Sequence, residues 1–567
     1  MADFDEVAAL LRRAEIGRRA FVTTPFGRRL VTYADQTATG RALAFVEEAV
    51  AAIRPLYANT HTSISTTGRV MSRLREEARR AVARAVGAGP EDVVLFTGSG
   101  ATAAVNKLVG LLGLRISEPL ERRYGLSRHL PADERPVVLV SPYEHHSNEL
   151  PWLESVAEVV EVALGADGRL DLADLDAKAR AHAGRPLKVG AFSAGSNVTG
   201  ALTDVRAVAR TLHAHGFVAC ADYAAAGPYV PIDMHPADPA ERLDAVFVST
   251  HKFAGGCEGS GVLVAHRDLF RSRVPERPGG GTVDYVAAFD RVAVDYTAHL
   301  AEREEGGTPD ILGDVRAALA FQVKEAAGPE RILAHDLALG ERAAARLARH
   351  PRVRLYGPPG PRLPILSFNV EGLHHDLASA LLDQLFGIQN RAGCACAGPY
   401  GHRLLGIGPE RSADHRRAIA AGVLALKPGW VRIGLPWYAT EAEVEFLLRA
   451  VEILADHGEA FVPLYRLGWR DGLWRHLEGE PPDPAPLALD ADLLLEAAAG
   501  RAPWLAVEEP GLSEADEAAA RAASLDEAVR LAGRLRERWR VEPPRWNAPT
   551  GDPAVDRLVW FRYVHAA

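Results

Sequence analysis

The chain has 567 residues, of which 48% are hydrophobic and 25% are charged, with a formal net charge of −9. This composition is typical of a globular protein with two or three domains and excludes a disordered chain. Acidic and basic residues are interspersed, so the sequence offers no basic face with which to neutralise nucleic-acid phosphates.

The first twenty residues are rich in charge and contain no unbroken apolar stretch, so no secretory signal is expected. No run approaches the length of a membrane-spanning helix. We therefore expect a cytoplasmic protein, with neither a membrane nor a nucleic acid among its partners.

Residues 1–30 predict an amphipathic helix and a lead-in strand, which form an N-terminal segment. Between about 90 and 270, apolar runs alternate with helical patterns. The runs are Val93–Phe96, Val137–Val140, Val159–Leu164, Leu187–Phe192, Phe217–Ala221, Ala245–Val248 and Gly261–Val264. Strands this apolar predict a mostly parallel sheet covered on both faces, in an α/β large domain spanning 31–310.

The pattern changes after residue 310 and predicts a smaller α+β domain over 311–458. Helices are expected at 315–326 and 376–386, and strands at 364–370 and 431–435. A further helix is expected from Thr440 to His457. Thr440 is its predicted N-cap, and Glu443 is predicted to close a capping box.

A C-terminal extension covers 459–567, and the sequence does not indicate its function. Six of the nine tryptophans fall there, and a proline-rich stretch at 481–486 interrupts it. We expect these tryptophans to anchor the extension on the main body or on a partner subunit. They are Trp469, Trp474, Trp504, Trp539, Trp546 and Trp560.

The four cysteines are too few for a disulfide framework in so long a chain. Cys394 and Cys396 form a Cys-x-Cys pair, which is tighter than the usual zinc-binding spacing and has no matching second pair. We therefore expect no metal site, and a reactive thiol is the better interpretation.

Lys252 ends the run Ser249-Thr250-His251-Lys252, which follows the predicted strand Ala245–Val248. Most lysines are solvated surface charges, but the carboxyl end of a strand is where an α/β fold holds its ligand. Asp222 follows the preceding predicted strand. Pyridoxal 5′-phosphate (PLP) needs such a carboxylate to keep its ring nitrogen protonated. The pair predicts a PLP site with a Schiff base on Lys252.

Two further turns fit such a site. The turn Thr97–Thr102 precedes a helical run and combines glycines, hydroxyls and free N–H groups, as an anion site does. It matches neither the dinucleotide-binding nor the Walker pattern. Asn197 could donate to the phenolic oxygen of the cofactor, although an asparagine in a turn is equally common.

Taken in order, the motifs resemble the class V aminotransferase fold, a fold type I PLP-dependent transferase, and within it the group II cysteine desulfurases and selenocysteine lyases. The resemblance spans roughly residues 30–455. Its motifs are Gly100–Asn106, Glu144–Asn148, Ser196–Gly200, Asp222, Ser249–Lys252, Gly307–Pro309, Arg391–Ala397 and Val431–Leu435.

The resemblance implies roles for individual residues of these motifs. The phosphate would be held by Ala101, Thr102, Ser249 and His251, and His145 would stack on the pyridine ring. Thr308 would reach the phosphate of the neighbouring subunit, which implies a homodimer. Arg432 would pair with the substrate carboxylate, since a guanidinium matches a carboxylate at two points. Arg391, which is close to Cys396 in the sequence, would also contact the substrate.

One stretch departs from the desulfurase pattern. Where desulfurases usually have Asp-Gly-Ala-Gln, this chain has Asp222-Tyr223-Ala224-Ala225. Ala225 cannot donate a hydrogen bond to the phenolic oxygen, which leaves more of that contact to Asn197. The glycine loop after Lys252 also contains Cys257-Glu258 and is one residue longer.

Cys396 aligns with the desulfurase nucleophile that takes sulfur from cysteine. The alternative is a buried, inert thiol, but the surrounding segment predicts a loop, and the guanidinium of Arg391 would favour the thiolate. Cys394 would support the reaction or accept sulfur. The Gly-Cys-x-Cys form also resembles the molybdenum-cofactor sulfurases, a related branch.

The leading hypothesis is therefore a PLP-dependent desulfurase or lyase acting on L-cysteine or a related amino acid, with Lys252, Asp222, His145 and Cys396 as catalytic residues and a sulfur-acceptor protein as a partner. A second hypothesis keeps the cofactor but not the thiol, as in an aminotransferase, epimerase or β-lyase acting on another amino acid. A third is a PLP-binding protein that recruits partners through its extension.

Overall fold

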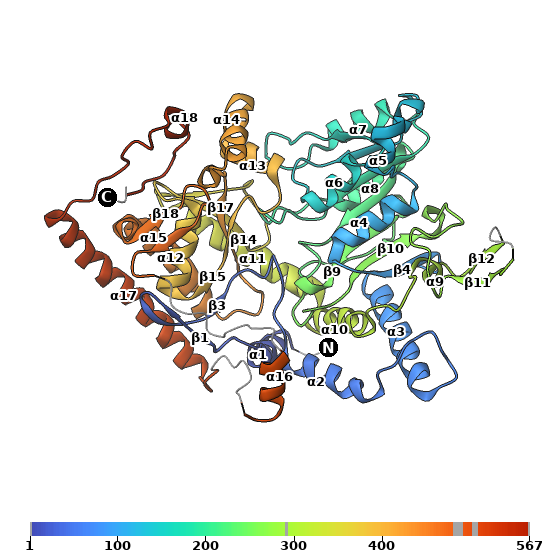
Figure 1. The fold of residues 1–567 in the computed structure, drawn as a ribbon, viewed down its shortest axis with the longest axis horizontal. Coiled ribbons are helices and arrows are strands. Elements are labelled where there is room, and N and C mark those ends of the chain that lie inside the picture. Colours follow the sequence, from blue (N-terminus) through green and yellow to red (C-terminus); the bar gives the residue numbers. More distant parts are fainter. Residues whose placement is uncertain (1–2, 290–292, 480–490, 502–508, 565–567) are drawn as a thin grey trace.

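The structure is a computed structural model, and it describes residues 3–289, 293–479, 491–501 and 509–564. Its larger sheet has seven strands in the order β4-β10-β9-β8-β7-β5-β6. Three of them, β4, β9 and β10, are labelled in Figure 1. Their bounds are β4 Asp92–Thr97, β5 Val137–Val140, β6 Glu158–Glu161, β7 Lys188–Ser193, β8 Val218–Asp222, β9 Ala245–Ser249 and β10 Gly261–His266. All seven predicted runs become strands of this one sheet.

The sheet is mostly parallel, as predicted, and β10 is its antiparallel strand. Because β10 runs against both β4 and β9, the carboxyl ends of β4, β5, β7, β8 and β9 share one edge. The loops that follow these five strands carry most of the predicted site residues. This shared edge is where an open α/β sheet binds its ligand.

Both faces of the sheet are buried, which explains the continuous apolar runs. Along β5, Val137 and Leu139 face one core cluster while Val138 and Val140 face another. The first cluster includes α3 (Thr66–Ala85), α8 (Val205–Ala214) and α10 (Ile311–Ala327), and the second includes α4 (Gly100–Leu111). α10, which follows the large sheet in the chain, packs closely against α3.

The N-terminal segment forms α1 (Phe4–Ala14) and then a hairpin of β1 (Phe21–Thr24) and β2 (Gly27–Leu30), where a single strand was predicted. Gly27 has a φ of 102°, which allows the tight turn between the two strands. The next strand, β3 (Thr32–Tyr33), pairs in parallel with β15 (Ile388–Gln389) and so connects this segment to the smaller domain.

The smaller sheet has the order β13-β14-β17-β16, with bounds Val353–Leu355, Ile365–Val370, Trp430–Gly434 and Arg391–Gly393. Helices α11 (Pro329–Ala348) and α12 (His375–Phe386) pack against it, and α15 (Glu441–His457) packs against both helices. Thr440 caps α15 by accepting a hydrogen bond from the Glu443 N–H, as predicted. The predicted capping box is wrong in its second half, because the Glu443 carboxylate binds Arg18 instead.

The C-terminal extension wraps the outer side of the smaller domain, where α17 (Glu514–Val541) runs along its edge (Figure 1). It also contains the hairpin of β18 (Tyr465–Leu467) and β19 (Trp474–His476), with α16 (Ala491–Ala498) and α18 (Pro553–Asp556). Trp469, Trp474 and Trp560 pack against the smaller domain's core, and Trp539 Nε1 donates to the Ala460 carbonyl at 2.8 Å. Trp504 and the proline-rich stretch lie outside the described residues.

A buried ion cluster fastens α17 to the N-terminal segment. Arg18 is 4% exposed and lies between the carboxylates of Glu443, at 2.5 Å, and Glu517, at 3.3 Å. Arg19 contacts the same Glu517 at 3.1 Å, and Arg521 lies beside it on α17. Such buried charges depend on one another, because each would otherwise be left desolvated without a partner.

Replacing Glu517 with alanine is expected to destabilise the fold by about 3–5 kcal/mol, because it leaves the buried Arg18 and Arg521 short of a counter-ion. Glu514 is the matched control: its carboxylate is 52% exposed and pairs with Arg12, so Glu514→Ala is expected to cost about 0–1 kcal/mol. Denaturant-unfolding midpoints of the two variants give the comparison. Equal midpoints would mean that the cluster does not hold the extension in place.

Among the helices that the structure describes, none combines the length and the apolar character needed to cross a membrane.

Candidate active site

Lys252 and Asp222 lie at the carboxyl ends of neighbouring strands. Asp222 is the last residue of β8, and Lys252 ends the short helix η5 (Thr250–Lys252) that follows β9 directly. Burial lowers the pKa of Lys252 to about 8, and the nearby Asp222 opposes that shift. Burial raises the pKa of Asp222, and its Oδ1 accepts a hydrogen bond from the Ala224 N–H at 2.8 Å. A pKa of about 8 leaves part of the Lys252 amine without its proton just above neutral pH.

The turn before α4 is shaped by close backbone contacts. Gly100 has a φ of 56°, and a Cβ there would lie 2.7 Å from Ser249 Oγ. Only glycine therefore fits, and the Ala101 N–H reaches Ser249 Oγ at 2.9 Å. Thr102 Oγ1 lies 2.7 Å from Ser147 Oγ at the cavity wall. N–H groups at the start of α4 and several hydroxyls thus converge, as at an anion site.

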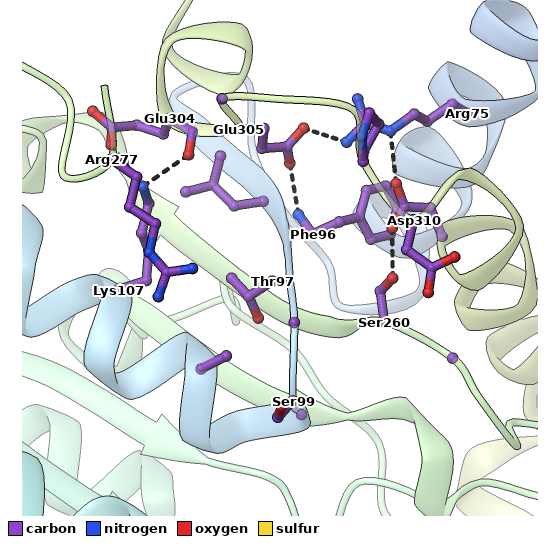
Figure 2. A pocket seen from close by; sticks show the side chains of 18 of the residues that line it. Arg75, Phe96, Thr97, Ser99, Lys107, Ser260, Arg277, Glu304, Glu305 and Asp310 are labelled. Atoms are coloured by element: carbon purple, nitrogen blue, oxygen red, sulfur yellow. Dashed lines mark hydrogen bonds and ion pairs between the residues drawn. The ribbon is translucent and has the colours of Figure 1, made fainter. Parts of the chain in front are cut away.

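A cavity of about 230 Å³, lined by Lys252 and Asp222, lies on one side of this turn. A second cavity, of about 570 Å³, lies on its other side (Figure 2). Lys107 pairs with Glu304 at 2.8 Å on one wall, and Glu305 accepts from the Phe96 N–H at 2.7 Å and contacts Arg75 on another. Its lining also includes Ser99 and His251, which line the first cavity too. The turn before α4 therefore separates the two cavities.

His145 follows β5, and its imidazole is neutral at pH 7. Burial, with Lys252 nearby, lowers its pKa to about 4, and its Nδ1 accepts from the Ser147 N–H at 3.1 Å. The preceding Glu144 is 2% exposed; its carboxylate accepts from the Ser193 N–H at 2.9 Å and from Asn148 Nδ2 at 2.7 Å. These bonds join the ends of β5 and β7 and fix the backbone that carries the imidazole.

Arg391 and Arg432 approach the cavity from the smaller sheet, where they are opposite each other in the β16–β17 register. Arg432 is 4% exposed and donates to the Asn197 carbonyl at 2.9 Å. Both guanidiniums contact Asp35: Arg432 Nη2 lies 3.0 Å from Oδ1, and Arg391 Nε lies 3.0 Å from Oδ2.

Cys396 lies on a loop with an unusual backbone. Ala395 and Cys396 have φ values of 50° and 54°, and each such conformation costs about 1 kcal/mol or more for a residue other than glycine. Three hydrogen bonds hold the loop: Asn197 Nδ2 to the Ala395 carbonyl at 2.8 Å, His146 N–H to the Cys396 carbonyl at 2.8 Å, and Gly398 N–H to His146 Nε2 at 3.1 Å. The contacts keep an exposed thiol facing the cavity.

The structure brings most of the predicted site residues around one cavity of about 230 Å³. They are Ala101, Thr102, His145, Asn197, Asp222, Ser249, His251, Lys252, Arg391, Cys396 and Arg432. Thr308 is not among the lining residues; it lies on an exposed loop, where its Oγ1 accepts from Asn59 Nδ2 at 2.9 Å. Cys394 is exposed and also lies outside the lining. Ala224 rather than Ala225 faces the cavity.

Sequence reasoning missed Asp35, and it gave Glu144 no role of its own. The available signal for Asp35 was indirect, since two arginines proposed for one small site imply a buried counter-ion. The partners of Glu144 come from the segment after β5 and from the end of β7, and only the pairing of these two strands brings them together.

The donor set fits PLP. The cavity offers an amine at Lys252, a buried carboxylate at Asp222 and a neutral imidazole at His145. The N–H of Ala101 and the hydroxyls of Thr102 and Ser249 gather where a phosphate would enter. These are the groups that such a cofactor requires.

Comparisons with known proteins identify the family of the chain. The Aminotransferase class-V family matches residues 32–447. A probable cysteine desulfurase of Staphylococcus epidermidis is 30% identical over 376 residues, 65% of this chain and 84% of the relative. One from Streptomyces coelicolor is 28% identical over 434 residues, 75% of this chain and 92% of the relative.

Among solved structures, the apo cysteine desulfurase of Thermococcus onnurineus NA1 has a TM-score of 0.60 at 26% identity and covers 75% of this chain and 95% of its own. The chain is thus similar to cysteine desulfurases in both sequence and fold. Its family match ends at residue 447 and leaves out the C-terminal extension. On this evidence the chain belongs to the class V aminotransferases, a family of enzymes with the fold type I architecture.

Proposed function

We propose that this protein removes sulfur from L-cysteine or a closely related amino acid, using PLP on Lys252 and a persulfide on Cys396. The observation that carries the proposal is the convergence of Lys252, Arg432 and Cys396 on one cavity of about 230 Å³. An amine, a carboxylate-binding guanidinium and a thiol are the groups that a desulfurase needs.

PLP, when bound, withdraws electrons from the α-carbon of an amino acid. Lys252 would hold the cofactor, and the buried Asp222 would keep its ring nitrogen protonated. Ala101, Thr102, Ser249 and His251 would bind its phosphate. His145, which is neutral at pH 7 because of its lowered pKa, would lie against the ring without adding charge.

Arg432, with Arg391, would bind the substrate carboxylate and so orient the amine towards Lys252. Lys252 Nζ would then move the α-proton, for which a pKa of about 8 is suitable. The Cys396 thiolate would attack the substrate sulfur. A sulfur–sulfur bond forms, the bond from carbon to sulfur breaks, and the electron pair left on carbon takes up a proton, which gives alanine and a Cys396 persulfide.

The exposure of Thr308 on its loop supports a homodimer, in which it would reach the phosphate of a second subunit. Cys394 and Cys396 are exposed, which supports transfer of sulfur to an acceptor protein. The enzyme, which we expect to be cytoplasmic, would then pass part of its sulfur to that protein instead of releasing all of it as sulfide. The described tryptophans of the extension are used within the chain, which does not favour a partner-recruiting role for them.

One observation favours a second function. The stretch Ala224-Ala225 supplies no side-chain donor for the phenolic oxygen, and Asn197 Nδ2, the remaining candidate, donates to Ala395 in this structure. An altered contact there fits an aminotransferase, epimerase or β-lyase acting on another amino acid.

Product analysis distinguishes the two functions. Incubating the PLP-loaded protein with L-cysteine and a reducing thiol is expected to give alanine and sulfide in equal amounts. A β-lyase would instead give pyruvate and ammonia with the sulfide, and an aminotransferase would need a keto-acid. Formation of pyruvate without alanine would overturn the desulfurase proposal.

A further inference from the structure

The loop that carries Cys396 depends on other segments for its shape. Two consecutive residues, Ala395 and Cys396, have left-handed φ values of 50° and 54°, which residues other than glycine seldom adopt. Within the loop, the Ala397 N–H donates to the Cys394 carbonyl at 3.1 Å. This turn leaves the carbonyls of Ala395 and Cys396 to other donors, and both accept hydrogen bonds from the large domain. Contacts from outside the loop therefore hold the backbone that carries the thiol.

Two residues of the large domain make these contacts. Asn197, which follows β7, donates from Nδ2 to the Ala395 carbonyl at 2.8 Å. His146, which follows β5, contacts the loop twice. Its N–H donates to the Cys396 carbonyl at 2.8 Å, and its Nε2 accepts from the Gly398 N–H at 3.1 Å. His146 thus binds the chain at the nucleophile and again two residues later.

The His146 imidazole is in the protonation state that this second contact requires. Because Nε2 accepts from the Gly398 N–H, the proton of the neutral ring lies on Nδ1. Burial lowers the pKa of His146, so the ring is neutral at pH 7. The backbone next to the ring is fixed as well, because the Glu144 carboxylate accepts from the Ser193 N–H at 2.9 Å and from Asn148 Nδ2 at 2.7 Å. His146 therefore links the Cys396 loop to a rigid edge of the large sheet.

His146 and Asn197 differ in what else they contact. Asn197 lines the Lys252 cavity and is the remaining candidate donor to the phenolic oxygen of the cofactor, so a change there would alter cofactor and loop together. His146 is not among the described residues that line this cavity. We propose that His146 is a positioning residue, whose side chain places the Cys396 thiol for attack on the substrate sulfur without contacting the cofactor or the amino acid. This inference rests on the proposed function, because it assumes that Cys396 is the nucleophile.

The test compares two amides at position 146 that differ by one methylene group. In His146→Gln the side-chain oxygen can lie where Nε2 lies and accept from the Gly398 N–H. In His146→Asn the oxygen lies near the position of Nδ1 and does not reach that N–H. The measurement is the rate at which the peptide spanning Cys394 and Cys396 gains sulfur in a single turnover of the PLP-loaded protein with L-cysteine. His146→Asn is expected to slow this step on the order of 5- to 10-fold, the net value of one hydrogen bond, and His146→Gln should stay close to wild type.

A second measurement separates positioning from general damage to the site. Binding of L-alanine, followed by the change in cofactor absorbance, should be the same in both variants and in wild type, because His146 lies outside the lining that contains Lys252 and Arg432. His129→Asn is the matched control. His129 is exposed and also lies outside this lining, so its replacement should change neither measurement.

Three results would overturn the inference: equal slowing in the two amide variants, a parallel loss of L-alanine binding, or sulfur transfer at the wild-type rate in His146→Asn. If His146→Asn does not fold, His146→Leu takes its place, because it keeps much of the bulk of the ring without the acceptor, and the same slowing is expected. If wild type binds L-alanine but gains no sulfur on this peptide, the proposed function fails, and this inference fails with it. Slowing confined to the variant without the acceptor instead supports both.

Discussion

Borohydride reduction of the PLP-loaded protein will attach a pyridoxyl group to the peptide that contains Lys252, and Lys252→Ala will lose turnover by at least about 10³-fold. The loss is large because the same Nζ would hold the cofactor and move the α-proton, and general acid–base catalysis by one residue typically contributes about 10²–10⁴-fold. Peptide mapping by mass spectrometry and a steady-state assay with L-cysteine make the two measurements.

Lys324 is a demanding internal control for the labelling. It is 3% exposed, donates to the Val230 carbonyl, and has a pKa that burial lowers to about 7, below that of Lys252. If a low pKa alone selected the modified amine, Lys324 would be labelled. It does not line the cavity with Asp222 and His145, so no pyridoxyl group is expected there. Label on any peptide without Lys252 would refute the assignment of the cofactor lysine.

The large sheet was predictable because its strands are short, apolar and separated by helical patterns. All seven runs were identified, and β8 was misplaced by only one residue at each end. The observed strand β8 therefore ends at Asp222. This position helps to explain why Asp222 is buried, because residues of β7 and β9 flank it. Local pattern thus gave the edge of the sheet at which the site forms.

Contacts between distant segments were not predictable in the same way. Asp35 meets Arg391 and Arg432 only because β3 pairs with β15, more than 350 residues further along the chain. The Glu443 carboxylate, predicted to cap its own helix, binds Arg18 because the segment that follows α1 lies close to both α15 and α17. In each case a tertiary ion pair decides the partner of a carboxylate, and periodicity carries no information about it.

The loop that carries the Cys396 thiol could be predicted only in part. The glycine-rich composition predicted a loop, and the resemblance placed Cys396 in it. The left-handed backbone at Ala395 and Cys396, and the bonds from Asn197 and His146 that hold it, required the structure. Strain held in place by surrounding contacts is common where a side chain must face a ligand.

Replacing Cys396 with serine is expected to abolish sulfur release from L-cysteine, because a hydroxyl at this position cannot accept a sulfane sulfur to form a persulfide. Amine binding, followed by the change in cofactor absorbance, should be retained, because Lys252 and Arg432 are untouched. Cys394→Ser should have the weaker effect on the first turnover, since Cys394 lies outside the cavity lining. Cys257→Ser is the control for a thiol, since Cys257 Sγ donates to the Gly40 carbonyl and is also outside that lining.

Mass spectrometry after a single turnover with L-cysteine locates the sulfur. The peptide spanning Cys394 and Cys396 should gain the mass of one sulfur atom in wild type and in Cys257→Ser, and a reducing thiol should remove it. In Cys396→Ser the same peptide should stay unmodified, because the thiol that faces the cavity is gone and Cys394 does not reach the substrate sulfur. If the Cys396→Ser variant still turns over some amino acid at the wild-type rate without modification of this peptide, the thiol plays no part, and the aminotransferase, epimerase or β-lyase becomes the better description.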